Sequence, residues 1–162
     1  MKKIFYLLLL IGALSSSCNE KEETMKGFSM NRIFFIEYAN ADGTNILNYD
    51  SQIEVYYDRN GIAEKVHRSN LSFPLGYTIT NIRDVSPEGL NELCVKVFPS
   101  DYMDDEKSSI TSIKLDDYQT DTIKCQFNAS SNSIYLQKIW YNKNLVWDKE
   151  TTKAPQIIRI VK

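Results

Sequence analysis

The chain has 162 residues, with 19 Lys and Arg against 21 Asp and Glu and a formal net charge of −2 at pH 7. This balance leaves no positively charged stripe, which argues against binding to nucleic acid. A single histidine and the lack of a Cys-x-x-Cys motif argue against a clustered zinc site, and we expect no cofactor. The part of the chain that follows the N-terminal leader described below is long enough for one domain with a sizeable core.

The first 18 residues have the anatomy of a secretory leader. Lys2 and Lys3 precede an apolar stretch at residues 4–14, which is shorter than the ~20 residues that a membrane-spanning helix needs. Small residues then lead to Cys18 in Leu14-Ser15-Ser16-Ser17-Cys18, which resembles the lipobox of bacterial lipoproteins. The resemblance implies that residues 1–17 are removed as a signal peptide and that Cys18 carries a diacylglycerol and a further acyl chain.

Residues 18–28 are predicted to form a lipidated, acidic tether. Asn19 follows the cysteine, in place of the Asp that retains many proteobacterial lipoproteins at the inner membrane, and acidic residues come next. This pattern also resembles the export signal of surface lipoproteins in Bacteroidetes. It implies an outer-membrane protein anchored through Cys18 and facing the cell exterior, with the periplasmic face as the alternative. Two or more acyl chains hold a protein stably in a leaflet, since each buried CH₂ contributes ~0.8 kcal/mol.

Residues 29–162 are predicted to form one all-β domain. Residues 52–57 alternate polar and apolar side chains, as a half-buried strand does, and Asn60-Gly61 supplies the positive φ angles of a tight hairpin turn. No stretch carries the sustained 3.6-residue apolar repeat and the caps of a helix. We therefore expect a two-layer antiparallel β-sandwich, with strands at residues 33–38, 52–57, 62–68, 77–85, 90–98, 110–115, 122–127, 134–141, 145–147 and 157–161.

The end of the domain carries a further resemblance. The closing stretch Lys138-Ile139-Trp140-Tyr141 … Leu145-Val146-Trp147-Asp148-Lys149, together with the lipobox and the acidic tether, is similar to small surface lipoproteins of Bacteroidetes. In these proteins of unknown function an immunoglobulin-like or transthyretin-like sandwich follows the anchor. The resemblance implies a location and a fold but no reaction, because one sandwich fold hosts many functions.

Residue types that support catalysis or metal binding are few. His67 is the only histidine, and no Gly-x-Ser-x-Gly elbow accompanies it, so we expect a surface histidine rather than a catalytic base. Calcium prefers six to eight oxygen ligands. The acidic residues to consider for such a site belong to the longest irregular loop: Asp101, Asp104, Asp105 and Glu106. Their spacing departs from the calcium-loop signature, so solvated loop residues are the favoured interpretation and no metal site is predicted.

Two cysteines remain besides Cys18. Cys125 alternates with apolar residues on the expected core face of its strand, whereas Cys94 falls on the more polar face of its own strand. A disulfide needs Cβ atoms ~3.8 Å apart. Two free thiols are therefore favoured over a bridge, although the oxidising compartment permits one.

One short motif concerns modification. Asp121-Thr122-Ile123 resembles the O-glycosylation acceptor of Bacteroidetes envelope proteins, which combines an acidic residue, a hydroxyl and an apolar residue. The resemblance implies a glycan on Thr122. An ordinary strand start is the alternative.

Trp140 and Trp147 are the residues that we nominate for recognition. They flank Asn142-Lys143-Asn144, which has the composition of a tight hairpin loop. A two-residue loop places both indoles on one face of the hairpin, whereas a three-residue loop places them on different faces. Either both indoles pack in the core, as large aromatic side chains usually do, or at least one stays exposed and stacks on a sugar ring or a peptide side chain.

The sequence thus predicts a tethered binding or interaction module, with a glycan, a peptide or an envelope protein as partner, and the balance is against an enzyme. The alternatives are a small surface hydrolase that uses carboxylates and a structural component of envelope assembly. A pocket lined by two close carboxylates would favour the hydrolase, and an open aromatic patch would favour the binding module. A long unpaired edge strand would favour envelope assembly.

Overall fold

The computed structural model describes residues 29–69, 72–86, 92–152 and 155–162. The predicted signal peptide, Cys18 and the tether lie outside the described residues. Within these ranges the chain forms one short 3₁₀ helix, Ile82–Asp84, and the following strands: β1 (Ser29–Asn31), β2 (Phe34–Ala39), β3 (Ile53–Arg59), β4 (Ile62–Lys65), β5 (Tyr77–Asn81), β6 (Leu93–Val97), β7 (Ser108–Leu115), β8 (Asp121–Ser130), β9 (Ser133–Tyr141), β10 (Asn144–Asp148) and β11 (Ile157–Val161).

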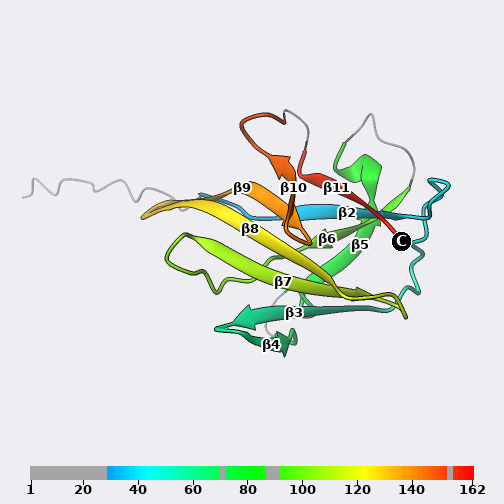
Figure 1. Cartoon of the computed structure of the whole chain (residues 1–162), viewed down its shortest axis with the longest axis horizontal. Coiled ribbons are helices and arrows are strands. Elements are labelled where there is room, and N and C mark those ends of the chain that lie inside the picture. The colour runs from blue at the N-terminus through cyan, green and yellow to red at the C-terminus, as the bar shows by residue number, and fades with distance from the viewer. Residues whose placement is uncertain (1–28, 70–71, 87–91, 153–154) are drawn as a thin grey trace, which may run out of the picture.

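The strands form two sheets that pack face to face (Figure 1). The larger sheet has the order β1-β9-β8-β7-β3-β4, and β10 also pairs with β9. The smaller sheet has the order β11-β2-β6-β5. The predicted all-β, two-layer sandwich is therefore confirmed, and every predicted strand is present with its ends shifted by a few residues. No helix in the described ranges is long and apolar enough to cross a membrane.

Two features of the sheets differ from the sequence-based prediction. The short strand β1 was not expected, and it pairs in parallel with β9, with Ser29 opposite Ser133. Strand β11 likewise pairs in parallel with β2, with Ile157 opposite Phe35. Both pairings join segments far apart in the sequence, so no local turn signal announces them. The sandwich is mainly but not purely antiparallel.

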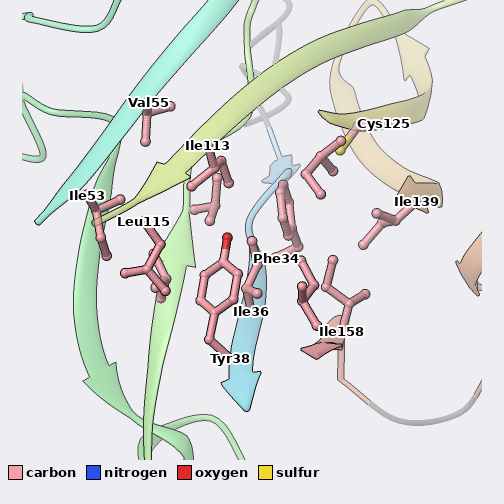
Figure 2. Close-up of a cluster of buried hydrophobic side chains, with 14 of the residues drawn as sticks. Phe34, Ile36, Tyr38, Ile53, Val55, Ile113, Leu115, Cys125, Ile139 and Ile158 are labelled. Atoms are coloured by element: carbon pink, nitrogen blue, oxygen red, sulfur yellow. The ribbon is translucent and has the colours of Figure 1, made fainter. Parts of the chain in front are cut away.

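The core lies between the two sheets and follows the alternation of strand side chains. On β3, Ile53, Val55 and Tyr57 are 7%, 2% and 6% exposed. Figure 2 shows side chains of β2, among them Phe34 and Ile36, lying between the sheets and facing residues of β7 and β8. The predicted core face of β3 is therefore correct, and the opposite face of the larger sheet is left to solvent.

Two hairpins are closed by two-residue turns in which both residues have positive φ. Asn60 and Gly61 have φ angles of 56° and 83° between β3 and β4, and the Gly61 N–H donates to Oδ1 of Asp58 at 2.9 Å. Asn142 and Lys143 have φ angles of 45° and 74° between β9 and β10. These angles fit the type I′ turns that match strand twist. The connection between the predicted strands at residues 77–85 and 90–98 lies largely outside the described residues.

A buried polar cluster joins the two sheets at one end of the core. We call Tyr38, Asp121, Tyr141 and Lys162 the cross-sheet clamp. The Lys162 ammonium donates to Oδ1 of Asp121 at 2.7 Å, Tyr141 donates to the same oxygen at 3.0 Å, and Tyr38 donates to Oδ2 at 2.9 Å. Tyr38 belongs to β2 and Lys162 follows β11, whereas Asp121 and Tyr141 belong to the larger sheet. Burial and the neighbouring carboxylate raise the pKa of Tyr38 well above its usual value and that of Tyr141 to about 12.

Candidate functional site

The two tryptophans lie on opposite faces of their hairpin. The turn has two residues, and Leu145 pairs with Trp140 as a two-residue loop requires. A β-bulge then shifts the register, so that Trp147 pairs with Ile139 rather than with Lys138. One extra residue in a strand reverses the facing of all residues beyond it. The prediction that a two-residue loop puts both indoles on one face is therefore wrong.

The bulge gives the two indoles different environments. Trp147 lies in the core and is 4% exposed, so it is not available to a ligand. Its Nε1 has no hydrogen-bond partner among the described residues. Trp140 lies on the outer face of the larger sheet and is half-buried. Of the two tryptophans, only Trp140 therefore remains as a candidate recognition residue.

Trp140 belongs to a row of side chains that crosses the outer face of the larger sheet. Ile110 of β7 pairs with Lys124 of β8, Lys124 pairs with Trp140, and Trp140 pairs with Leu145 of β10. Ile110 and Leu145 are 37% and 51% exposed. We call these four residues the outer row. Because neighbouring strands lie ~4.8 Å apart, the row extends about 14 Å.

Lys124 gives this surface a positive charge beside its aromatic ring. The Lys124 ammonium lies 5.7 Å from the centre of the Trp140 ring and 3.8 Å from a carboxylate oxygen of Glu106. Both charged side chains are well exposed, with fractions of 41% and 75%. Such an exposed ion pair contributes little to stability, so Lys124 is free to engage another group.

A pocket of about 160 Å³ continues the row beyond Ile110, at the tip of the β3–β4 hairpin. We call it the hairpin-tip pocket, and its lining residues come from three separate segments: Asp58, Asn60, Tyr102, Met103, Asp104, Ser108, Ser109 and Ile110. Paired strands β3 and β7 separate beyond Tyr57 and Thr111, their last paired residues. The loop that precedes β7 fills one side of the gap, and the remaining space is the pocket.

The polar groups of this pocket are incompletely satisfied. Ser108 and Ser109 are each 3% exposed, and neither hydroxyl oxygen has a hydrogen-bond partner among the described residues. A buried hydroxyl without a partner costs about 1–3 kcal/mol. Asp58 and Asp104 each use Oδ1 to accept a backbone N–H, from Gly61 at 2.9 Å and from Ser108 at 2.7 Å. Their Oδ2 atoms accept no hydrogen bond from the described part of the chain, so the pocket holds both donors and acceptors for a polar ligand.

The acidic residues considered for calcium do not converge. Asp101 accepts two hydrogen bonds from Arg68, at 2.8 and 2.9 Å, and these hydrogen bonds lower the pKa of its carboxyl group. Asp104 faces the hairpin-tip pocket, Asp105 is exposed, and Glu106 approaches Lys124. Among the described residues no three His, Cys, Asp or Glu side chains are grouped as a metal ion requires.

A second groove is lined in part by Pro99 and Asp101, at the start of the loop that precedes β7. It has a volume of about 250 Å³ and is lined by Met30, Arg32, Ile33, Tyr57, Arg68, Phe98, Pro99 and Asp101. Its cations are already engaged, because Arg32 donates to the backbone oxygens of Pro99 and Ser100 while Arg68 pairs with Asp101. The groove is therefore mainly apolar, and its charges stabilise the loop.

The other residues singled out in the sequence lie apart from these surfaces. His67 is exposed and follows β4. Cys94 and Cys125 are both buried free thiols, and burial raises the pKa of Cys94 to about 11 and that of Cys125 further. Thr122 is exposed at the start of β8. Its neighbour Asp121, the acidic residue of the glycosylation-like motif, is 2% exposed within the cross-sheet clamp.

Sequence reasoning identified Trp140 but missed the hairpin-tip pocket. Asp58 and Asn60 carry a clear turn signal, and Asp104 was considered only as a calcium ligand. The two serines at the start of β7 carry no signal of their own, because only the folded chain leaves their hydroxyls without partners. No protein family, curated protein or solved structure matches the chain.

Proposed function

We propose that the protein is a lipid-anchored component of the cell envelope that binds a ligand on the outer face of its larger sheet. In this proposal Cys18 anchors the chain in the outer membrane, with the domain toward the cell exterior. The observation that carries the binding function is Trp140, a partly exposed indole set in a row with the exposed apolar residues Ile110 and Leu145. Aromatic side chains with an apolar face and a polar atom are enriched at binding surfaces.

The surroundings of Trp140 support this proposal. The apolar side chains of the outer row lose stabilisation by remaining in water, and a ligand that covers them would restore it. The row is continuous with the hairpin-tip pocket through Ile110. The ligand would thus meet an aromatic ring, a cation and a polar pocket on one face.

A second candidate, a small hydrolase, is favoured by one observation. Asp58 and Asp104 line the same pocket, and paired carboxylates are the machinery of glycoside hydrolysis. Each carboxylate, however, has one oxygen bound to a backbone N–H of its own turn. Asp58→Asn and Asp104→Asn would abolish turnover but not binding if the protein were a hydrolase, so product formation distinguishes the two functions. For envelope assembly by strand addition, the described edges are short: β4 has four residues and β5 has five.

Fluorescence can test binding at Trp140, because the chain has only two tryptophans. The Trp147→Phe variant of the full lipidated protein, solubilised in detergent, leaves Trp140 as the sole indole. We would measure iodide quenching of its emission with panels of soluble oligosaccharides and of peptides. The proposal expects at least one class to protect Trp140 from iodide, and protection by neither class would contradict it. The matched variant Trp140→Phe, which keeps Trp147, should show little quenching in either condition because that indole is buried.

Localisation needs a separate test. Cys18→Ser should leave the protein unprocessed or released from membranes, whereas the parent protein should fractionate with the outer membrane and be accessible to protease on intact cells. A Cys18→Ser protein that stays as firmly bound as the parent would contradict the anchor.

A further inference from the structure

We infer that the ligand of the outer face is an oligosaccharide that lies across the strands, with one ring in the hairpin-tip pocket and another on Trp140. This inference rests on the proposed function, because it names the ligand class of the same surface. Two observations carry it independently. One is the buried, unpartnered Ser108 hydroxyl beside the pocket, on the same strand face as Ile110, and the other is the row that leads from the pocket to the indole.

The pocket has the chemistry of a site for a neutral, hydroxyl-rich ring. Its free carboxylate oxygens on Asp58 and Asp104 can accept hydrogen bonds, and the Ser108 hydroxyl can both donate and accept. A sugar hydroxyl also donates and accepts at one atom, so it can satisfy both kinds of group at once. The side chain of Tyr102 provides an apolar wall at the same place.

Size favours a single ring at this position. The pocket volume of about 160 Å³ is that of about five water molecules at ~30 Å³ each. It is smaller than the 300–1,000 Å³ of pockets that enclose a whole drug-sized ligand. A ligand that gains affinity here must therefore continue outside the pocket.

The outer row offers the continuation. Asp58 and Ile110 both line the pocket, and Ile110 connects through Lys124 to Trp140 by direct cross-strand pairing. Two strand spacings separate Ile110 from Trp140, and the pocket lies one strand beyond, so the ring positions are about 14 Å apart. This separation requires a tetrasaccharide or a longer chain. The apolar face of a sugar ring suits the indole, and the Lys124 ammonium, 5.7 Å from the indole centre, can donate to hydroxyls between the two ends.

The sharpest variant is Ser108→Ala. It removes a buried hydroxyl that has no protein partner, so stability should be unchanged or slightly higher. Loss of one hydrogen bond to a ligand should nevertheless weaken binding about three- to tenfold. If this serine had only a structural role, its replacement would not weaken binding while leaving stability unchanged. Thr78→Ala, on β5 of the smaller sheet, is the matched control and should change neither quantity.

The experiment is calorimetric titration of the full lipidated protein in detergent with cello-, malto-, xylo-, manno- and chito-oligosaccharides of one to six units. We expect one series to bind, with a steep gain in affinity once the chain reaches four units. Trp140→Ala should weaken that binding about tenfold or more, as anchor residues do, and should remove the gain with length. Ser108→Ala should weaken it while the unfolding midpoint is preserved.

The remaining outcomes overturn the inference in distinguishable ways. Affinity that does not depend on length, or that is indifferent to Ser108→Ala, would contradict the position across the strands. If no oligosaccharide binds and a peptide protects Trp140 from iodide, the inference fails while the proposed binding function stands. If neither class protects Trp140, both fail.

Discussion

Replacing Lys162 with methionine should destabilise the domain by about 3 kcal/mol. Lys162 and Asp121 have side chains that are 7% and 3% exposed and lie 2.7 Å apart. Removing one partner of a buried ion pair typically costs 3–5 kcal/mol, because the remaining charge is buried without compensation. Tyr38 and Tyr141 still donate to the Asp121 carboxylate in the variant, so we expect the lower end of that range.

Urea unfolding followed by Trp147 fluorescence would measure this loss. For a urea m value of about 2 kcal/mol/M, a 3 kcal/mol loss lowers the midpoint by about 1.5 M. Lys149→Met is the control, because Lys149 is an exposed lysine 5.2 Å from the Tyr135 ring, and its midpoint should change little.

A double variant tests the physical reason. Asp121→Asn combined with Lys162→Met removes both charges and should recover part of the stability lost in Lys162→Met alone, since no isolated charge remains. If Lys162→Met costs less than about 1 kcal/mol, which is the range of exposed pairs, or if the double variant is less stable than the single, the clamp is not a buried charge pair.

Three further outcomes follow from the structure. Gly61→Ala should lower the free energy of unfolding in urea by about 1–2 kcal/mol. Gly61 has a φ of 83° and no atom would contact an added Cβ, so this cost comes from backbone conformation alone. Gly61→Asn should cost less, and equal costs would contradict this explanation. The thiols of Cys94 and Cys125 should not react with Ellman's reagent at pH 8 in the native protein, because burial raises both pKa values and the thiolate is the reactive form. Both thiols should react in urea. Two thiols that stay unreactive in urea would indicate a disulfide. The pKa of Tyr141 is raised to about 12 from a usual value near 10, so the protonated phenol stabilises the folded state. This stabilisation is complete below pH ~10 and should be lost as the pH rises to 12. An alkaline unfolding midpoint that is identical in Tyr141→Phe would refute this link.

The sequence-based prediction was most accurate where one strand determined its own pattern. The alternation of Ile53, Val55 and Tyr57 and the turn at Asn60-Gly61 are local, so the β3–β4 hairpin and its core face could be predicted. The bulge between Leu145 and Trp147 could not, because nothing in those residues distinguishes a regular strand from one with an extra residue. That single residue decides which tryptophan meets solvent.

The pocket and the parallel strands were unpredictable for another reason. Asp58, Tyr102 and Ser109 come from three segments whose proximity depends on the register between β3 and β7. Register between distant strands is set by the whole core rather than by either strand alone. The cross-sheet clamp has the same origin, since Tyr38 and Asp121 are 83 positions apart.

The unequal attachment of the first two strands gives the domain a graded response to mechanical load. Strand β1 consists of three exposed residues paired only with β9, whereas β2 is held between β11 and β6. For a domain anchored at its N-terminal end, tension reaches β1 first, and those few hydrogen bonds would open while the core stays intact. If the chain is anchored through Cys18 as proposed, β1 would be the part of the domain that yields first under tension.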